Sequence, residues 1–197
     1  MSNPAFTNII INGKRSEQRS LYEKMKRLQE RKKPLVENVF YYPTRWLGNL
    51  VTRLGADWRE VYCGGTWSDL RLNSKTLNFF TETAWKPPFE LLKLISRVYP
   101  SLTCYFEAEG DDWDVYLTND AEGRFFSARY VVDMEPDTEY FDTIEEVCLH
   151  VAPYIGRTAT NKKELLHAID EWEAENEDPE KYVLIKEIEV ISESDYW

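Results

Sequence analysis

The stretch from residue 77 to residue 132 constrains the fold of this chain more than any other part of it. Leu77–Trp85 is rich in aromatic and β-branched residues, which predicts a strand, and Pro87-Pro88 then begins a helix that Pro100 ends. Apolar and polar residues alternate in the three runs that follow, which are separated by turns: Thr103–Glu109, Trp113–Leu117 and Phe126–Val132. This pattern is typical of an antiparallel meander with one face in water.

A strand, a helix and three further strands predict an α+β fold with a ferredoxin-like antiparallel sheet, a β-α-β-β-β core, and additional helices at both ends. The sequence also predicts a short strand at residues 6–11, helices that begin at Ser20, Pro43, Thr143 and Asn161, and a last strand at residues 182–192. We expect residues 1–75 to be an N-terminal extension with a basic helix and a core-packing helix. Residues 76–197 are expected to form the ferredoxin-like core with C-terminal helices and a strand, the whole being one compact unit.

The charge of the chain is unevenly distributed. The formal net charge is −11, yet residues 14–33 hold nine Lys or Arg against three Glu, a local balance of +6. Residues 101–123 hold seven carboxylates and no basic residue, and residues 164–197 hold twelve acids against two lysines. Such a field repels DNA over most of the surface and attracts basic proteins, although acidic surfaces also serve solubility alone.

Composition and cysteine usage indicate a folded protein of a reducing compartment. Hydrophobic residues make up 43% of the 197 residues and aromatic residues 14%, which is typical of a chain that folds. The first thirteen residues lack the basic and apolar segments of a signal peptide, and no stretch approaches membrane-spanning length. The three cysteines fit no disulfide framework. We therefore expect the protein in a reducing cytoplasm.

The patterns that carry catalysis or cofactor binding are weak in this sequence. Cys63, Cys104 and Cys148 are too few for an iron–sulfur cluster and too scattered for a zinc site. Cys148 and His150 would point to different faces of a helix, so Cys148 is expected in the core. His167 lies among charged residues and is expected on a solvated face. The sequence Asp111-Asp112-Trp113-Asp114 lacks the Gly and closing Glu of an EF-hand. We expect no catalytic residue, no cofactor and no metal site.

The central segment resembles a known family. TAWKPP at residues 83–88, the Tyr99-Pro100 helix end, the strand LTCYFEAEG and the aromatic hairpin after it are similar to the YubB ferredoxin-like domain family of enterobacterial plasmids and phages. The likeness covers residues 78–132, with a weaker echo at Gly64–Trp67. It implies a ferredoxin-like fold without an iron–sulfur cluster and a mobile-element accessory role, such as countering host defence, with no site residue to carry over.

The first hypothesis for function is protein–protein interaction through an acidic surface. A negative patch would face a basic groove on a host protein, as in an inhibitor of a defence or DNA-binding system that mimics the charge of DNA. A hairpin can hold carboxylates at the rigid spacing that such mimicry needs. The patch is predicted at Glu107, Glu109, Asp111, Asp112, Asp114, Asp120 and Glu122.

The second hypothesis is nucleic-acid binding through the basic helix at residues 14–33. Basic side chains would contact phosphates while nearby aromatic residues stack on bases. The predicted residues are Arg19, Lys24, Lys26, Arg27, Arg31, Lys32 and Lys33. The same helix could instead dock on the protein's own acidic surface or on a second copy, and an enzyme of unrecognised type or a structural role also remains open.

Overall fold

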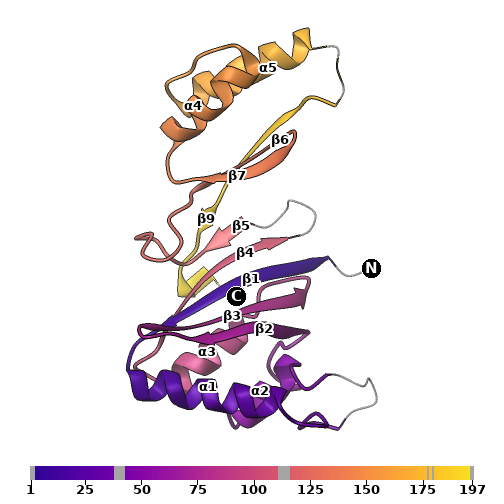
Figure 1. Ribbon diagram of the computed structural model, residues 1–197, viewed down its shortest axis with the longest axis vertical. Helices are drawn as coiled ribbons and strands as arrows, with labels where there is room; N and C mark the ends of the chain where they lie inside the picture. Colours follow the sequence, from indigo (N-terminus) through magenta and orange to yellow (C-terminus); the bar gives the residue numbers. More distant parts are fainter. Residues whose placement is uncertain (1–2, 38–42, 111–115, 177, 179, 196–197) are drawn as a thin grey trace. The chain divides into compact units, whose positions relative to one another are not determined.

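Figure 1 shows the computed structural model, which describes residues 3–37, 43–110, 116–176, 178 and 180–195. These residues form an α+β protein with five α-helices and nine β-strands. The chain divides into two compact units, which we call the first unit (residues 1–121 and 190–197) and the second unit (residues 122–189). The boundary expected between residues 75 and 76 falls inside the first unit, in a turn between two paired strands. No helix of the described residues is long and apolar enough to cross a membrane.

A six-stranded sheet of order β2-β3-β1-β4-β5-β9 forms the centre of the first unit. Each pairing from β2 to β5 is antiparallel. The N-terminal strand lies in the middle of this sheet, between two strands that are more than sixty residues away along the chain. The strands are β1 (Pro4–Asn12), β2 (Gly65–Leu72), β3 (Thr76–Ala84), β4 (Thr103–Gly110), β5 (Tyr116–Thr118) and β9 (Glu189–Val190).

Three helices cover one face of this sheet (Figure 1): α1 (Arg15–Gln29), α2 (Leu47–Arg53) and α3 (Phe89–Val98). The strands alternate buried and less buried residues, so Ile9, Ile11 and Phe106 join the helices in the core. Helix α1 begins five residues before Ser20, and the predicted capping box there does not form its start. Its buried Gln18 instead donates hydrogen bonds to the carbonyl oxygens of Ile11 and Lys75.

The β2 edge of the sheet is protected against pairing with other chains. Trp46 forms an isolated bridge to Thr66, and the Trp67 amide donates to the Arg45 carbonyl oxygen over 3.1 Å. Beyond that point, a shift in the β2–β3 register follows Ser68, and Asp69 adopts a φ of 51°. A covered half and a bulged half leave little continuous edge for another strand.

The second unit is a three-stranded antiparallel sheet packed against two helices. The strand order is β7-β6-β8, and the elements are β6 (Tyr130–Met134), β7 (Asp137–Phe141), α4 (Ile144–Ile155), α5 (Lys162–Glu175) and β8 (Val183–Glu187). The predicted capping box of Thr143 and Glu146 is present in full at the start of α4. A separate core forms around Val132, Val151 and Leu165.

The prediction of a three-stranded meander was wrong in its third member. β4 and β5 pair as expected, whereas the run at residues 126–132 contributes β6, which starts at Tyr130 and pairs with β7 and β8 in the other sheet. Alternation identifies a strand and its buried face, but it does not identify the strand with which it pairs. Residues 113–115 of the middle run, Trp113–Leu117, lie outside the described residues.

Candidate interaction surface

The face of the first unit's sheet that α1, α2 and α3 do not cover carries aromatic and acidic side chains, and we call it the open face. Strand alternation places residues of one parity on it, because residues directly opposite each other in neighbouring strands share a face. Two cross-strand rows result, Thr66–Glu82–Phe6–Glu109–Tyr116 and Ser68–Phe80–Asn8–Glu107–Thr118. Strand pairing thus brings together residues that lie up to 110 positions apart in sequence.

Phe6 is the central residue of the first row. It lies opposite Glu82 on one side and opposite Glu109 on the other. Its ring stacks on that of Phe80, with the ring centroids 6.2 Å apart and the planes inclined by 16°. Phe6 and Phe80 are half-buried, and Glu82 is exposed. Aromatic faces and carboxylates are therefore within one strand spacing of each other on the open face.

The structure divides the predicted acidic patch. Glu107 and Glu109 lie on the open face, and Glu122 is exposed in the second unit, where it pairs with Arg124 over 2.6 Å. Asp120 is only 1% exposed, so its carboxylate does not belong to a surface patch. Its amide donates a hydrogen bond to Thr118 Oγ1 just after the end of β5. Asp111, Asp112 and Asp114 lie outside the described residues.

The acidic bias of the chain belongs to the second unit as a whole. Its 68 residues contain eighteen Asp or Glu against seven Lys or Arg, a formal net charge of −11 that equals that of the entire chain. The first unit holds seventeen of each sign and is formally neutral. The formal charge is therefore divided between a neutral first unit and an acidic second unit, and not between a basic helix and an acidic remainder.

Many of these carboxylates lie on helix α5, and some carboxylates of the unit form ion pairs or hydrogen bonds with nearby side chains. Arg157 pairs with Glu171 over 2.9 Å and with Glu175 over 2.7 Å, and Lys162 pairs with Glu187. The hydrogen bonds from Thr160 to the Glu164 carboxylate lower the pKa of Glu164.

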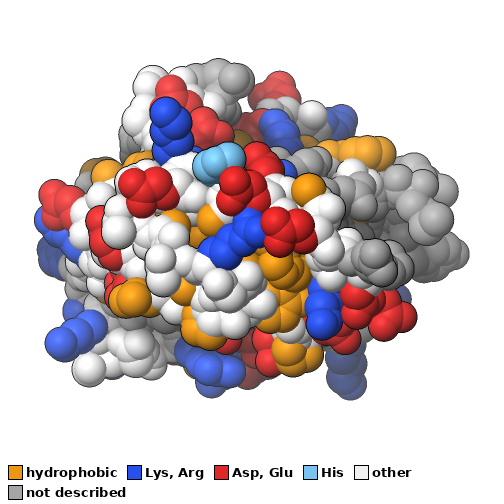
Figure 2. All heavy atoms as spheres, turned by 90° about the horizontal axis from the view of Figure 1, so that it is seen from above, with side chains coloured by type: hydrophobic (Ala, Val, Ile, Leu, Met, Phe, Trp, Pro, Cys, Tyr) orange, Lys and Arg blue, Asp and Glu red, His pale blue; other side chains and the backbone are white. Residues whose placement is uncertain are grey.

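The second unit also exposes apolar side chains among its charges. Figure 2 looks onto the face over α4 and α5, where carboxylates border a strip of exposed hydrophobic side chains, with basic side chains among them. Exposed apolar patches inside a charged border are a mark of protein interaction sites. Large hydrophobic residues exposed in this unit are Tyr140, Leu149, Leu166, Tyr182 and Leu184.

Carboxylates and local hydrogen-bond partners lie among the predicted basic residues. Lys24 binds the Tyr99 hydroxyl and lies 4.9 Å from the centroid of that ring. Lys26 is 4.0 Å from Glu30, and Arg31 donates to the carbonyl oxygen of Lys33. Helical spacing places Arg19 and Arg27 on the solvent side of α1 together with Glu23 and Glu30. The mixed signs weaken the case for phosphate binding. Lys32 and Lys33 are exposed beyond the helix end.

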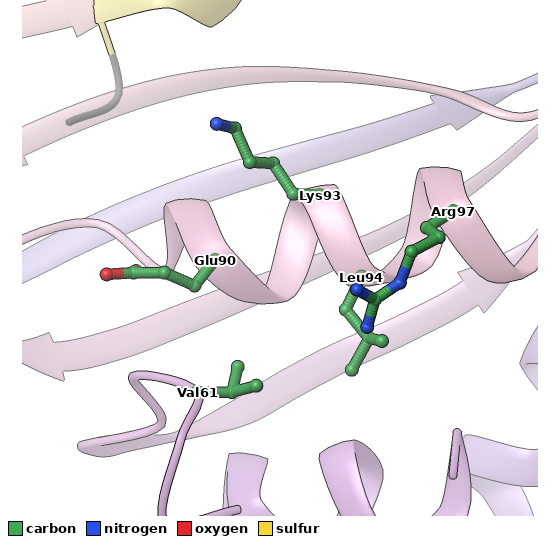
Figure 3. Close-up of a pocket in the computed structure, with 5 residues that line it drawn as sticks. All are labelled: Val61, Glu90, Lys93, Leu94 and Arg97. Carbon is green, nitrogen blue, oxygen red and sulfur yellow. The ribbon is translucent and has the colours of Figure 1, made fainter. Parts of the chain in front are cut away.

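A shallow pocket of about 340 Å³ lies along α3 (Figure 3). Val61 lines it from the loop between α2 and β2, and the other lining residues come from one side of α3: Glu90, Lys93, Leu94 and Arg97. In Figure 3 the carboxyl group of Glu90 points away from the other lining residues, toward the start of α3. There Glu90 accepts a hydrogen bond from Lys86 Nζ over 2.6 Å. The polar groups therefore do not converge on one point in the pocket.

Burial favours the protonated form of two side chains, Tyr62 and Cys63, in the loop that contributes Val61. Burial raises the pKa of the Tyr62 hydroxyl, and Lys86 Nζ lies over the Tyr62 ring at 4.9 Å from its centroid. Burial also raises the pKa of the Cys63 thiol to about 11, and this thiol donates to the carbonyl oxygen of Trp58. A thiol with a raised pKa is a poor nucleophile near neutral pH.

Within the described part of the chain, no group of three or more His, Cys, Asp or Glu side chains is placed to hold a metal ion. Cys63, Cys104 and Cys148 are buried as free thiols, and Cys148 belongs to the core of the second unit, as predicted. His150 lies 3.8 Å from Glu139 and against the ring of Phe141, and His167 is exposed 3.4 Å from Glu171. These contacts connect the imidazoles to single carboxylates of the same unit.

Sequence reasoning missed Phe6, Phe80 and Glu82 as surface residues. The alternating burial of β1 and β3 places them on one face. The sequence of residues 6–11 does not show this alternation, because the polar Thr7 is buried while the apolar Phe6 lies on the open face. Their proximity depends on the pairing of β1 with β3, which the local pattern does not specify. No family model, no curated protein and no solved structure matches this chain. The resemblance to the YubB family therefore stays a prediction.

Proposed function

We propose that this protein acts without catalysis, by binding a partner protein with a basic surface through the acidic second unit. The observation that carries the proposal is the location of charge: residues 122–189 hold the full formal charge of −11, while the rest of the chain is neutral. A field of one sign confined to one unit raises the rate and the selectivity of association with a partner of opposite sign.

Exposed apolar side chains within the same unit support a protein partner over free counterions. Leu149 is 76% exposed on α4, and Leu166 is 43% exposed on α5. Apolar contacts inside a charged border provide the desolvated centre that protein interfaces use. Asp170 and Glu173 of α5 are exposed carboxylates that can form part of that border.

The finer form of the proposal follows the sequence resemblance. The order β2-β3-β1-β4, with antiparallel pairing and helices in both crossovers, supports a ferredoxin-like arrangement of the first unit. An acidic unit of this kind suits a phage- or plasmid-encoded accessory protein in the bacterial cytoplasm. Such a protein would inhibit a host defence or DNA-binding system by mimicking the charge of DNA. Nucleic-acid binding by α1 is less well supported because Glu23 and Glu30 lie among its cations.

Charge reversal in the second unit tests the proposal. The measured quantity is the affinity for a fluorescent ten-lysine peptide at about 50 mM and about 200 mM NaCl, since exposed charges interact over the Debye length. The double variant Asp170→Lys, Glu173→Lys is expected to bind about tenfold more weakly at low salt. The matched control is Glu37→Lys, Glu60→Lys, which reverses two exposed carboxylates of the first unit. Equal losses in both variants would show that only net charge matters and would contradict a specific role of the second unit.

A further inference from the structure

The open face of the first unit combines features that suit a planar cation. The Phe6 ring lies in a row directly between Glu82 and Glu109, and it stacks on Phe80. Side chains directly opposite each other in paired strands have their β-carbons about 4.5–5.5 Å apart. A cation placed over the Phe6 ring is therefore within reach of a flanking carboxylate without any change in the backbone.

The chemistry of the face selects the kind of cation. An aromatic face attracts a positive charge, and the planar guanidinium of arginine both stacks on a ring and donates paired hydrogen bonds to a carboxylate. A lysine ammonium can also lie over a ring, but it is a compact and strongly hydrated charge. It therefore cannot stack as a plane or form the paired hydrogen bonds of a guanidinium. Asn8, which is exposed in the neighbouring row, adds an amide that can bind peptide groups.

Aromatic residues on the inner strands of an antiparallel sheet also suit nucleic-acid bases. The charges on this face oppose that occupant, because Glu82, Glu107 and Glu109 lie in the two rows that contain the aromatic rings. Arg71, which faces Asn78 in the same sheet, is 3.6 Å from Asp69. Phosphate groups would thus meet carboxylates beside the rings, while a basic peptide meets complementary charge.

We propose that the open face binds an extended, arginine-bearing segment of a partner protein, with one guanidinium stacked over Phe6 and paired with Glu82. This deepens the proposed function, because it names the group that the basic partner presents, and it rests on that function only in requiring a basic partner. The surface is distinct from the carboxylates of the second unit. Failure of one site therefore does not imply failure of the other.

An NMR titration of the full chain with a five-residue peptide tests the proposal. The probe is acetyl-Arg-Ala-Arg-Ala-Arg-amide, and the comparison probe carries citrulline, the uncharged isostere, in place of each arginine. We expect the arginine peptide to shift the amide signals of β1 and β3 and to bind at least about fivefold more tightly than the citrulline peptide. Equal affinity for the two peptides, or shifts confined to other parts of the chain, would overturn the proposal.

Variants at Phe6 separate a binding role from a packing role. Phe6→Leu keeps an apolar side chain but removes the aromatic face, and we expect about fivefold weaker binding, whereas Phe6→Trp is expected to bind at least as tightly as the native protein. Glu82→Gln is expected to weaken binding by a similar factor, since it removes the charge at nearly constant shape. Unchanged binding in both Phe6→Leu and Glu82→Gln would contradict the inference.

An oligonucleotide and the second-unit variant complete the test. If a ten-residue oligothymidine bound the native protein and lost affinity in Phe6→Leu, the face would be a nucleic-acid site and the proposal would be wrong. The double variant Asp170→Lys, Glu173→Lys is expected to retain the β1 and β3 shifts with the arginine peptide. Loss of those shifts in that variant would show that the open face is not an independent site.

Discussion

Gly65 of β2 lies so close to the carbonyl oxygen of Glu82 in β3 that a β-carbon on it would be 2.0 Å from that oxygen. Gly65 also pairs directly with Thr83, and the Gly64 carbonyl oxygen accepts a hydrogen bond from the Ala84 amide. The glycine pair and the start of the TAWKPP segment, which both stand out in the sequence, are thus neighbours in space. Their contact fixes how β2 lies on β3.

Substitution of Gly65 by alanine is expected to destabilise the first unit. The clash involves backbone atoms of β3, which cannot move aside as a side chain can, so we expect a loss of about 3 kcal/mol in the free energy of unfolding. Urea unfolding followed by tryptophan fluorescence measures it. Gly64→Ala is the matched control, because its nearest contact is the Tyr62 ring at 3.2 Å and a side chain can shift. Equal stability of Gly65→Ala and the native protein would contradict the described packing of β2.

Trp85 adopts a left-handed backbone conformation with a φ of 73°, and its side chain is 65% exposed. The left-handed region costs a bulky residue about 1–2 kcal/mol, while an exposed side chain contributes little packing. Trp85→Gly is therefore expected to raise the free energy of unfolding by about 0.5–1 kcal/mol, after the greater entropy of an unfolded glycine is included. Trp85→Ala keeps the strain, so Trp85→Gly is expected to have the higher midpoint of thermal unfolding of the two variants. A less stable Trp85→Gly would show that the Trp85 ring has stabilising contacts.

The Cys63 thiol is expected to resist alkylation. Burial raises its pKa from 9.0 to about 11, so the thiolate fraction at about pH 8 is about a hundredfold lower than in the unfolded chain. Peptide mapping by mass spectrometry after iodoacetamide treatment, with and without urea, measures the rate at this residue. Because the folded state holds the proton more tightly, this thiol's contribution to stability is fully present below about pH 9 and is lost as the pH rises toward 11. Equal rates with and without urea would contradict the burial.

Arg157 connects the end of α4 to α5 through its ion pairs with Glu171 and Glu175. The arginine side chain is 25% exposed, but the two carboxylates are largely in solvent, so Arg157→Ala is expected to cost about 1 kcal/mol in the second unit. Hydrogen exchange of α5 amides measures the loss. The control Arg59→Ala removes an exposed pair with Asp57 and should leave α5 unchanged. Identical α5 protection in Arg157→Ala and the native protein would show that the pairs contribute nothing.

Local sequence signals predicted many of the elements. The alternation from Thr103 onward corresponds to β4, the proline pair precedes α3, and the Thr143 and Glu146 capping box starts α4. These features depend on residues a few positions apart, so the pattern contains the information that defines them. Strand β7 was not predicted, because its residues are mostly charged or exposed and lack alternation.

Features that depend on distant pairing could not be predicted in the same way. Nothing in residues 4–12 indicates that β1 lies between β3 and β4, so the cross-strand rows of the open face were not foreseen. The burial of Asp120 was missed because an aspartate in a turn sequence normally indicates exposure. Of the residues predicted for one patch, Glu107 and Glu109 share a strand face of the first unit, Glu122 is exposed in the second unit, and Asp120 is buried.

The most direct test of the account is to map a basic ligand on the full chain by NMR. A ten-lysine peptide is added to labelled protein at about 50 mM NaCl, and amide shifts are assigned to the two units. The account predicts that the largest shifts fall in residues 122–189, include the amides of Asp170 and Glu173, and fade as the salt concentration rises. An absence of shifts in residues 122–189, with binding elsewhere in the chain, would contradict the central claim that the acidic unit binds the partner.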